Sequence, residues 1–190
     1  MPKGVRPTQD KVRKALFDIL GDIEGLSFLE LFAGSGAVGL EAISGGVKDL
    51  TLVEYNPDCL LALRKNIESL KLKACNLYPQ EAEKTIKNLH RDKKKFNIIF
   101  LDPPYPRGLF PRPRKKLDNR GSGLADATIN DSLAKKTLQI LGAYDILARH
   151  GFIIAQHFKK DSLPEALGDL RLFRQARYGD TVLSFYKRTV

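Results

Sequence analysis

The fold of this chain is most constrained by residues 29–40, which combine a short apolar strand, a glycine turn and the start of a helix. Gly34, Gly36 and Gly39 match the pattern G-x-G-x-x-G. Gly34 and Gly36 allow the backbone to turn tightly, and they let a ligand approach the amide groups at a helix N-terminus, which carry partial positive charge. On its own, the glycine pattern is a weak signal for a nucleotide site.

A second apolar strand, residues 50–53, is followed by Glu54, eighteen residues after Gly36. An acidic side chain in this place can accept hydrogen bonds from both hydroxyl groups of a ribose. Strand, glycine loop, helix, strand and acid together predict a site for a nucleotide-like cofactor. The alternative is that Glu54 is an ordinary surface carboxylate and that the glycines serve helix packing alone.

A third motif, Leu-Asp-Pro-Pro-Tyr-Pro at residues 101–106, follows the apolar run 96–100. Because a residue before proline favours extended conformations, Asp102 and Pro103 are both expected to be extended at a strand end. A planar NH2 group could donate one hydrogen bond to the Asp102 carboxylate and another to the Pro103 carbonyl, while Tyr105 stacks on the attached ring. The alternative is a proline-rich turn with a solvated aspartate.

Strand and helix patterns alternate along the chain, which predicts an α/β fold with an open, mostly parallel, doubly wound sheet covered on both faces. Strands after residue 70 are expected near residues 76–78, 96–100, 152–155, 172–173 and 182–186, with a turn at 178–180. The first and fourth strands of such a sheet are neighbours at the point where ligands bind. The glycine loop and Asp102 are therefore expected to face each other.

The helix patterns give two more specific expectations. A helix is predicted after Pro7, with Thr8 as its N-cap and Asp10 in its first turn. Another helix is predicted after residues 56–58. Its expected apolar stripe is Leu60, Leu61, Leu63, Ile67 and Leu70.

These motifs together resemble the class I S-adenosylmethionine-dependent methyltransferases, and within them the RsmD type, which methylates the exocyclic N2 amine of a guanine in 16S ribosomal RNA. The resemblance rests on residues 6–17, 31–42, 53–54 and 102–105. It implies one Rossmann-like methyltransferase domain over residues 1–190, with a seven-stranded sheet and an antiparallel last strand. Residues 1–24 would form an N-terminal helix segment, and residues 106–131 a basic insertion loop.

The resemblance also assigns roles to residues. Asp102, Pro103, Pro104 and Tyr105 would be catalytic: they hold the target amine so that its lone pair points at the methyl group of the cofactor. S-adenosylmethionine would be bound by Thr8, Glu30, Phe32, Ala33, Gly34, Ser35, Gly36, Glu54, Tyr55, Glu81 and Ala82. Glu81 has an alternative role as a helix-start acid. The histidines His90, His150 and His157 are interpreted as structural or surface residues.

The charge of the chain suits a polyanionic partner, because 32 basic and 22 acidic residues give a formal net charge of +10. The expected partner is 16S rRNA or the assembling small ribosomal subunit. The expected RNA contacts are Arg6, Arg107, Arg112, Arg114, Lys115 and Lys116. The alternative for the loop after Tyr105 is a solvated insertion without RNA contact. The other basic run, residues 91–95, precedes a strand and is expected on the opposite rim as a solvated loop.

Two departures from the family pattern stand out. The chain lacks most of the basic N-terminal hairpin that usually precedes Arg6, and the loop after Tyr105 is longer than usual. Gln156 and His157 stand where the family often has an acid, and neither residue is given a role.

The remaining expectations concern cell location and cofactors. Cys59 and Cys75 lack metal-ligand spacing, so no metal site is expected. No apolar run approaches the length of a membrane span. We expect a cytoplasmic monomer without membrane association.

Three other functions compete with this interpretation. A DNA or RNA adenine-N6 or protein glutamine-N5 methyltransferase would share every site residue. A nicotinamide dehydrogenase would leave the Asp-Pro-Pro-Tyr motif without a role. An RNA-binding protein on an inactive methyltransferase fold would be expected to have lost a loop glycine or Asp102, and both are present.

Overall fold

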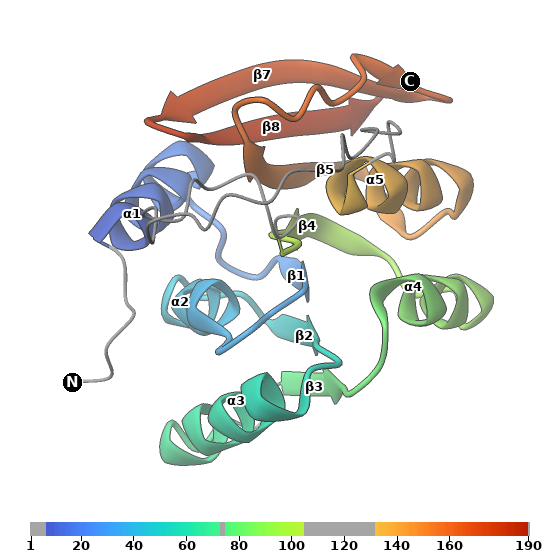
Figure 1. The fold of residues 1–190 in the computed structure, drawn as a ribbon. Helices are drawn as coiled ribbons and strands as arrows, with labels where there is room; N and C mark the ends of the chain where they lie inside the picture. Colours follow the sequence, from blue (N-terminus) through green and yellow to red (C-terminus); the bar gives the residue numbers. More distant parts are fainter. Residues whose placement is uncertain (1–6, 73–74, 105–131, 190) are drawn as a thin grey trace, which may run out of the picture.

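The computed structural model describes residues 7–72, 75–104 and 132–189. It contains an eight-stranded sheet in the order β3-β2-β1-β4-β5-β8-β7-β6 (Figure 1). The strands are β1 Ser27–Leu31, β2 Asp49–Val53, β3 Cys75–Tyr78, β4 Phe96–Leu101, β5 Leu147–Phe158, β6 Ala166–Leu167, β7 Leu170–Tyr178 and β8 Thr181–Arg188. Strands β1 to β5 pair in parallel, whereas β8 runs antiparallel to both β5 and β7.

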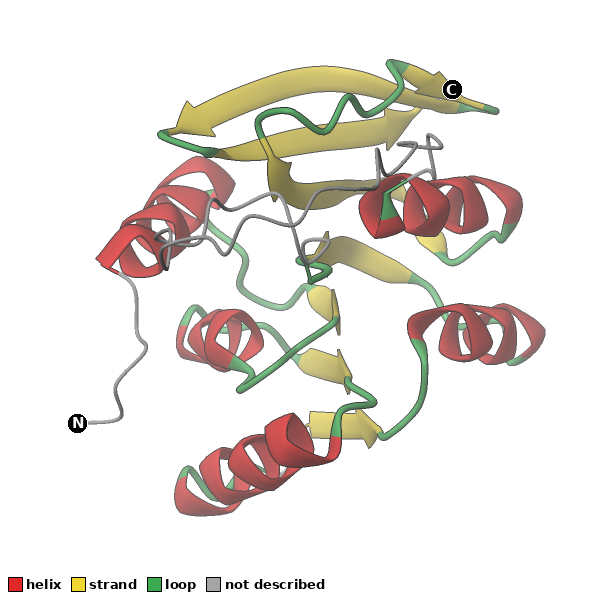
Figure 2. Cartoon of the chain, viewed as in Figure 1, coloured by secondary structure: helices red, strands yellow, loops and turns green. Residues whose placement is uncertain are grey.

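The helices cover both faces of this sheet (Figure 2). They are α1 Pro7–Leu20, α2 Ala37–Ser44, α3 Pro57–Ser69, α4 Ala82–Arg91 and α5 Leu133–Ala143. Figure 1 shows α1, α2 and α3 on one face, and α4 and α5 on the other. Each face has its own apolar cluster: Leu16 and Leu63 belong to the first, Ile86 and Leu138 to the second. The predicted α/β fold, with a mostly parallel sheet and an antiparallel last strand, is confirmed.

The expected strand count of seven falls one short of the sheet in the structure. The additional strand, β6, contributes only Ala166 and Leu167 at the edge beside β7. Two residues are too few to produce an alternating pattern in a sequence. Strand β5 also begins before the predicted residues 152–155. Its first half was not predicted because Arg149 and His150 are polar and exposed, so that this part lacks a continuous apolar run.

Two helix predictions were wrong in detail. Helix α1 begins at Pro7, so Thr8 lies within the helix and is not its N-cap; proline is well suited to the first helical position. In α3, Leu63 is buried as predicted, but Leu61 is 71% exposed and Leu70 is 55% exposed. Leu61 lies about 200° around the helix from Leu63 at 3.6 residues per turn. Leu70 follows the last helical residue.

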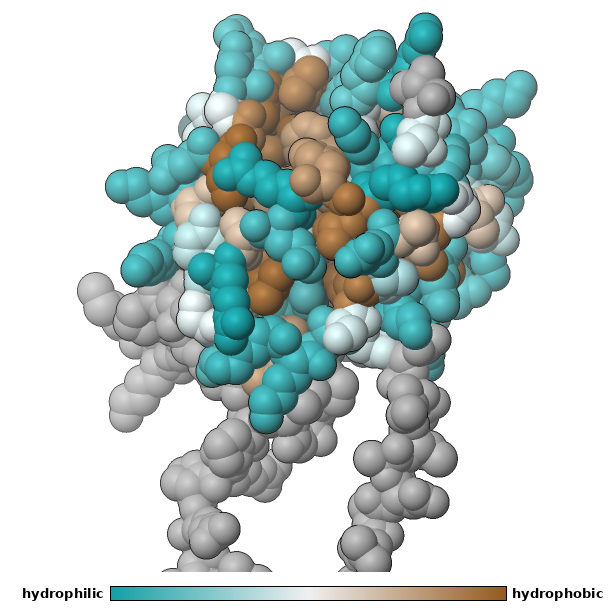
Figure 3. All heavy atoms as spheres, turned by 90° about the horizontal axis from the view of Figure 1, so that it is seen from above, coloured by the Kyte–Doolittle hydropathy of each residue, from teal (hydrophilic) through white to brown (hydrophobic). Residues whose placement is uncertain are grey.

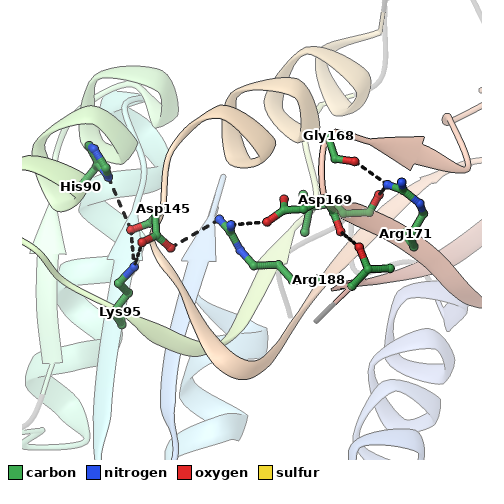
Figure 4. Close-up of polar contacts among 9 residues, drawn as sticks. His90, Lys95, Asp145, Gly168, Asp169, Arg171 and Arg188 are labelled. Carbon is green, nitrogen blue, oxygen red and sulfur yellow. Dashed lines mark hydrogen bonds and ion pairs between the residues drawn. The ribbon is translucent and has the colours of Figure 1, made fainter.

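The rim of the sheet away from Glu54 and Asp102 is held together by ion pairs (Figure 4). Lys95, just before β4, pairs with Asp145, just before β5. Arg188 at the end of β8 pairs with Asp145 at 3.5 Å and with Asp169 at 2.5 Å. The basic run 91–95 thus lies on the opposite rim, as predicted, and its last lysine joins the start of β4 to the residue before β5. None of the described helices is long and apolar enough to cross a membrane.

Candidate active site

A cavity of about 460 Å³ lies beyond the carboxyl ends of β1, β2 and β4. This is where an open α/β sheet binds its ligands, and the volume lies within the range of small-molecule sites. Its walls come from α1, the β1–α2 loop, the start of α3 and the ends of β4 and β5. The lining residues are Asp10, Arg13, Leu16, Glu30, Phe32, Ala33, Gly34, Ser35, Ala37, Val38, Glu54, Tyr55, Asn56, Cys59, Phe100, Asp102, Pro104 and Gln156.

The glycine loop turns sharply between β1 and α2. Gly34 has φ 57° and Gly36 has φ 79°, a region of backbone conformation that favours glycine. A Cβ atom on Gly36 would also lie 2.4 Å from Cδ1 of Leu63. Phe32 has φ 61° and is not a glycine, so the loop contains a strained residue next to the cavity.

Glu54 fastens this loop to the end of β2. Its Oε2 accepts a hydrogen bond from the Gly34 N–H at 2.7 Å. Its Oε1 accepts from the N–H groups of Tyr55 at 2.9 Å and Asn56 at 2.8 Å. Glu54 is only 7% exposed, which excludes the interpretation of an ordinary surface carboxylate.

Glu30 places a second buried carboxylate beside the cavity, at 3% exposure. Its Oε2 accepts a hydrogen bond from the Gly39 N–H at 2.8 Å, which fixes the start of α2 against β1. Burial raises the pKa of this carboxyl from 4.5 to about 8, opposed by the Gly39 hydrogen bond and assisted by the charges of Asp102 and Glu54.

Asp102 is the third carboxylate at the cavity, directly after β4. The residue as a whole is partly exposed, whereas its carboxyl group lies deep in the cavity. This burial raises the pKa of Asp102 from 3.8 to about 7, and a hydrogen bond from the Gln156 side chain acts in the opposite direction. Asp102 is therefore not the solvated aspartate of a turn. Two of the three acids at the cavity have raised pKa values, so a positively charged ligand would bind best to their ionised forms.

The structure brings together most of the predicted cofactor residues. Glu30, Phe32, Ala33, Gly34, Ser35, Glu54 and Tyr55 line the cavity, together with Asp102 and Pro104. Gly36 is the N-cap of α2, and Pro103 lines a small neighbouring hollow that also contains Gln156. Glu81 and Ala82 begin α4 after β3 and do not line the cavity.

Other predicted residues lie outside the described part of the chain. Tyr105, Arg6, Arg107, Arg112, Arg114, Lys115 and Lys116 belong to this group, and they stay predictions. The structure describes the backbone of Thr8 within α1 but not its side chain, so its predicted cofactor contact also stays open.

Arg13 and Gln156 line the cavity, although the sequence predicted no site role for them. Arg13 of α1 pairs with Asp10 at 3.0 Å and with Glu41 of α2 at 2.8 Å. Gln156 lies on β5, the strand next to β4, and its side chain forms a hydrogen bond with the Asp102 carboxyl group. Arg13 lies within residues 6–17, on which the family resemblance rests, and Gln156 stands where the family often has an acid, but neither signal indicated these contacts.

The three histidines lie apart from the cavity. His157 is 3% exposed. Its Nε2 is 2.8 Å from Ser184 Oγ, and its Nδ1 is 3.1 Å from the Phe158 carbonyl oxygen. His90 and His150 are exposed. Among the described residues, no group of three or more His, Cys, Asp or Glu side chains is arranged to hold a metal ion.

Comparison with known proteins identifies the family. Residues 1–129 match the family model described as Conserved hypothetical protein 95. A Bacillus subtilis protein named putative rRNA methyltransferase YlbH is 31% identical over 185 residues, which are 96% of this chain and 88% of that protein. This chain belongs to that family, the RsmD family of methyltransferases. The resemblance seen in the motifs is thereby confirmed.

Further relatives support the RsmD assignment. The Escherichia coli ribosomal RNA small subunit methyltransferase D is 37% identical over 127 residues, which cover 66% of this chain and 62% of that enzyme. The solved structure of a putative methyltransferase, yhhF from Escherichia coli, superposes with a TM-score of 0.73 at 26% identity, covering 99% of this chain and 90% of that protein.

Proposed function

We propose that this chain transfers the methyl group of S-adenosylmethionine to the exocyclic N2 amine of a guanine in 16S rRNA. The observation that carries the proposal is the buried carboxylate of Asp102, which shares one cavity with the glycine loop and Glu54. Membership of the RsmD family supports the substrate, because relatives carry the name ribosomal RNA small subunit methyltransferase D.

The cavity residues fit the proposed cofactor. When bound, S-adenosylmethionine supplies an electrophilic methyl group on a positively charged sulfur. Glu54 would accept a hydrogen bond from a ribose hydroxyl, since Oε1 already accepts two backbone hydrogen bonds and Oε2 uses only one of its two lone pairs, on Gly34. Tyr55, 54% exposed at the cavity, offers an aromatic face for the adenine. A cationic ligand would in turn favour the ionised forms of Glu30 and Asp102, whose pKa values burial raises to about 8 and about 7.

Asp102 and Pro103 would hold the target amine. The Asp102 carboxylate accepts a hydrogen bond from one N–H of the amine, and the Pro103 carbonyl accepts one from the other. These bonds favour a pyramidal nitrogen and aim its lone pair, so catalysis consists mainly of orientation and electrostatic stabilisation. The raised pKa of Asp102 also suits it to take the proton that the methylated amine releases, with water as the alternative acceptor.

The cofactor site is tested by titrating purified protein with S-adenosylmethionine in a calorimeter. Glu54→Ala should weaken binding by ~10-fold or more, because it removes a buried acceptor at the ribose position. Glu83→Ala, an exposed carboxylate on α4, is the matched control and should bind as the unaltered protein does. Equal affinities of the Glu54 and Glu83 variants would overturn the role of Glu54.

The substrate class is tested by offering labelled S-adenosylmethionine together with small-subunit RNA, DNA or protein in separate reactions. Label in the RNA alone is the expected result. Label in DNA or protein instead would favour an adenine-N6 or glutamine-N5 methyltransferase with the same site residues.

A further inference from the structure

The hairpin of β7 and β8 carries an exposed aromatic residue placed by a bulge. The register of the two strands shifts between Leu172, opposite Tyr186, and Arg174, opposite Phe185, and so leaves Phe173 without a partner. A bulge redirects side chains at this point. Phe173 contacts the buried ring of Phe185 edge-on, with 6.2 Å between ring centroids, and remains 48% exposed.

Two cations lie near the rings of Phe173 and Phe185 on this hairpin. Lys187 Nζ lies 5.3 Å from the centroid of the Phe173 ring, and Arg174 Cζ lies 5.8 Å from that of Phe185. Arg171 is the cross-strand partner of Lys187, and its guanidinium donates hydrogen bonds to the carbonyl oxygens of Gly168 and Leu170. Arg171, Phe173, Arg174 and Lys187 are all exposed; together they are called the hairpin patch.

The cations of the hairpin patch are not neutralised by acids. Strands β7 and β8 contain no Asp or Glu. Within the described part of the chain, no salt bridge involves Arg171, Arg174 or Lys187. Arg188 on the same hairpin differs, because it pairs with Asp145 and Asp169 and serves the rim. Concentrated positive charge without partners favours an anionic ligand.

The hairpin patch lies on the same face of the sheet as α1, and its Arg171 and Lys187 lie at the end of the hairpin next to the rim that Arg188 joins. Phe185, beneath the patch, belongs to the same apolar cluster as Val12 and Leu16 of α1. Helix α1 also lines the cavity through Arg13, and Figure 1 shows it next to β7 and β8. Figure 3 views this end of the molecule from above and shows apolar side chains lying among hydrophilic ones.

We propose that the hairpin patch binds a single-stranded segment of the RNA substrate outside the cavity. The proposal rests on the proposed function for the identity of the RNA. Single-stranded RNA is recognised by aromatic side chains that stack on bases and by cations that contact the backbone. Phe173 would stack on one base, and Arg171, Arg174 and Lys187 would contact the neighbouring phosphates.

The test measures binding of labelled oligouridine and of labelled small-subunit rRNA at several salt concentrations, without cofactor. The double variant Arg174→Gln with Lys187→Gln should bind at least ~5-fold more weakly and reduce the slope of log affinity against log salt by about 1.4, which is two phosphate contacts on a single strand. Phe173→Ala should weaken binding by ~5-fold or more with the slope unchanged, since stacking is uncharged.

The matched control is Lys84→Gln with Lys94→Gln, which removes the same charge from exposed positions on α4 and the rim opposite the cavity. Its affinity should stay within about 2-fold of the unaltered protein, as for remote surface charges under salt screening. Equal losses in both double variants, or none in the hairpin variants, would overturn the proposal. RNA binding is measured without methyl transfer. The result for the hairpin patch therefore does not depend on whether the proposed methylation occurs, and the two proposals can fail separately.

Discussion

At the scale of single residues, the proposed chemistry depends on the carboxylate of Asp102. Asp102→Ala should lower methyl transfer by ~100-fold or more, the loss typical of one preorganised hydrogen-bond partner at a reacting group. The affinity for S-adenosylmethionine should change by no more than a few-fold. Single-turnover transfer and calorimetry measure the two quantities separately, and Asp92→Ala, an exposed aspartate, is the control. Unchanged turnover would remove the proposed role of Asp102.

The raised pKa of Asp102 predicts how the rate of methyl transfer depends on pH. The amine is held by the ionised carboxylate, and burial puts the pKa of this group at about 7. Transfer at limiting substrate should therefore rise with pH and level off above about pH 7. Gln156→Ala removes the hydrogen bond that lowers this pKa, so its profile should lie at higher pH. A profile that does not move would show that Gln156 leaves the ionisation of Asp102 unaffected.

The site residues that could be predicted from the sequence are those that belong to motifs. Glu54 and Asp102 each end a recognisable apolar strand, so both were found, and the cavity contains both. Gln156 and Arg13 act through contacts with residues of other elements, and no spacing in the sequence encodes those contacts. The burial of Glu54 could be established only from the structure, because its three backbone hydrogen-bond donors belong to the glycine loop and to the residues just before α3.

At the scale of elements, Gly39 sets how closely α2 packs on β1 and β2. A Cβ atom at this position would lie 2.6 Å from Leu52 Cδ2 and 2.7 Å from Glu30 Oε2. Gly39→Ala should destabilise the protein by about 1–3 kcal/mol, the usual cost of overpacking a core. The control is Gly142→Ala in α5, where the nearest contacts begin at 3.4 Å. Chemical denaturation of both variants measures the difference, and equal stabilities would contradict the packing interpretation.

The order of the elements was predictable because strand and helix patterns alternate and each strand on the parallel side is a short apolar run. The details that failed have local causes. The buried face of α3 contains fewer leucines than the sequence pattern suggests, because Leu61 is exposed. The bulge at Phe173 is invisible in the sequence, because it depends on how β7 pairs with β8. In a regular strand, the adjacent residues Phe173 and Arg174 would point to opposite faces, so the sequence does not indicate that both lie on one face.

At the scale of the whole molecule, the buried acids of the site make stability depend on pH. The native pKa of Glu30 is about 8 against an ordinary value of 4.5, so the native state binds more protons than the unfolded state between these values. The stability that Glu30 contributes is complete below about pH 4.5 and is lost as pH rises through about 8.

Glu30→Gln mimics the protonated form and should remove this loss. At pH 8.5 the variant should be more stable than the unaltered protein by ~1 kcal/mol or more, which raises Tm by about 2–4 °C for a chain of this size. At pH 5 the two proteins should melt at similar temperatures. Thermal melts at both pH values measure the effect, and equal destabilisation at both would contradict the raised pKa.

The formal net charge of +10 describes the chain but not where its cations lie. Lys95 and Arg188 serve the rim opposite the cavity, whereas Arg171, Arg174 and Lys187 have no acidic partner among the described residues. This division predicts that RNA binding depends on the hairpin patch and is insensitive to removal of the exposed lysines Lys84 and Lys94.

The central claim is most directly tested by identifying the methylated nucleoside. Small-subunit RNA and particles from cells without this protein would be incubated with the protein and labelled S-adenosylmethionine, digested and separated by mass spectrometry. We expect label in N2-methylguanosine, and less of it by ~100-fold or more when Asp102→Ala replaces the unaltered protein. Label in a methylated adenosine, or no label in RNA despite cofactor binding, would contradict the proposed function.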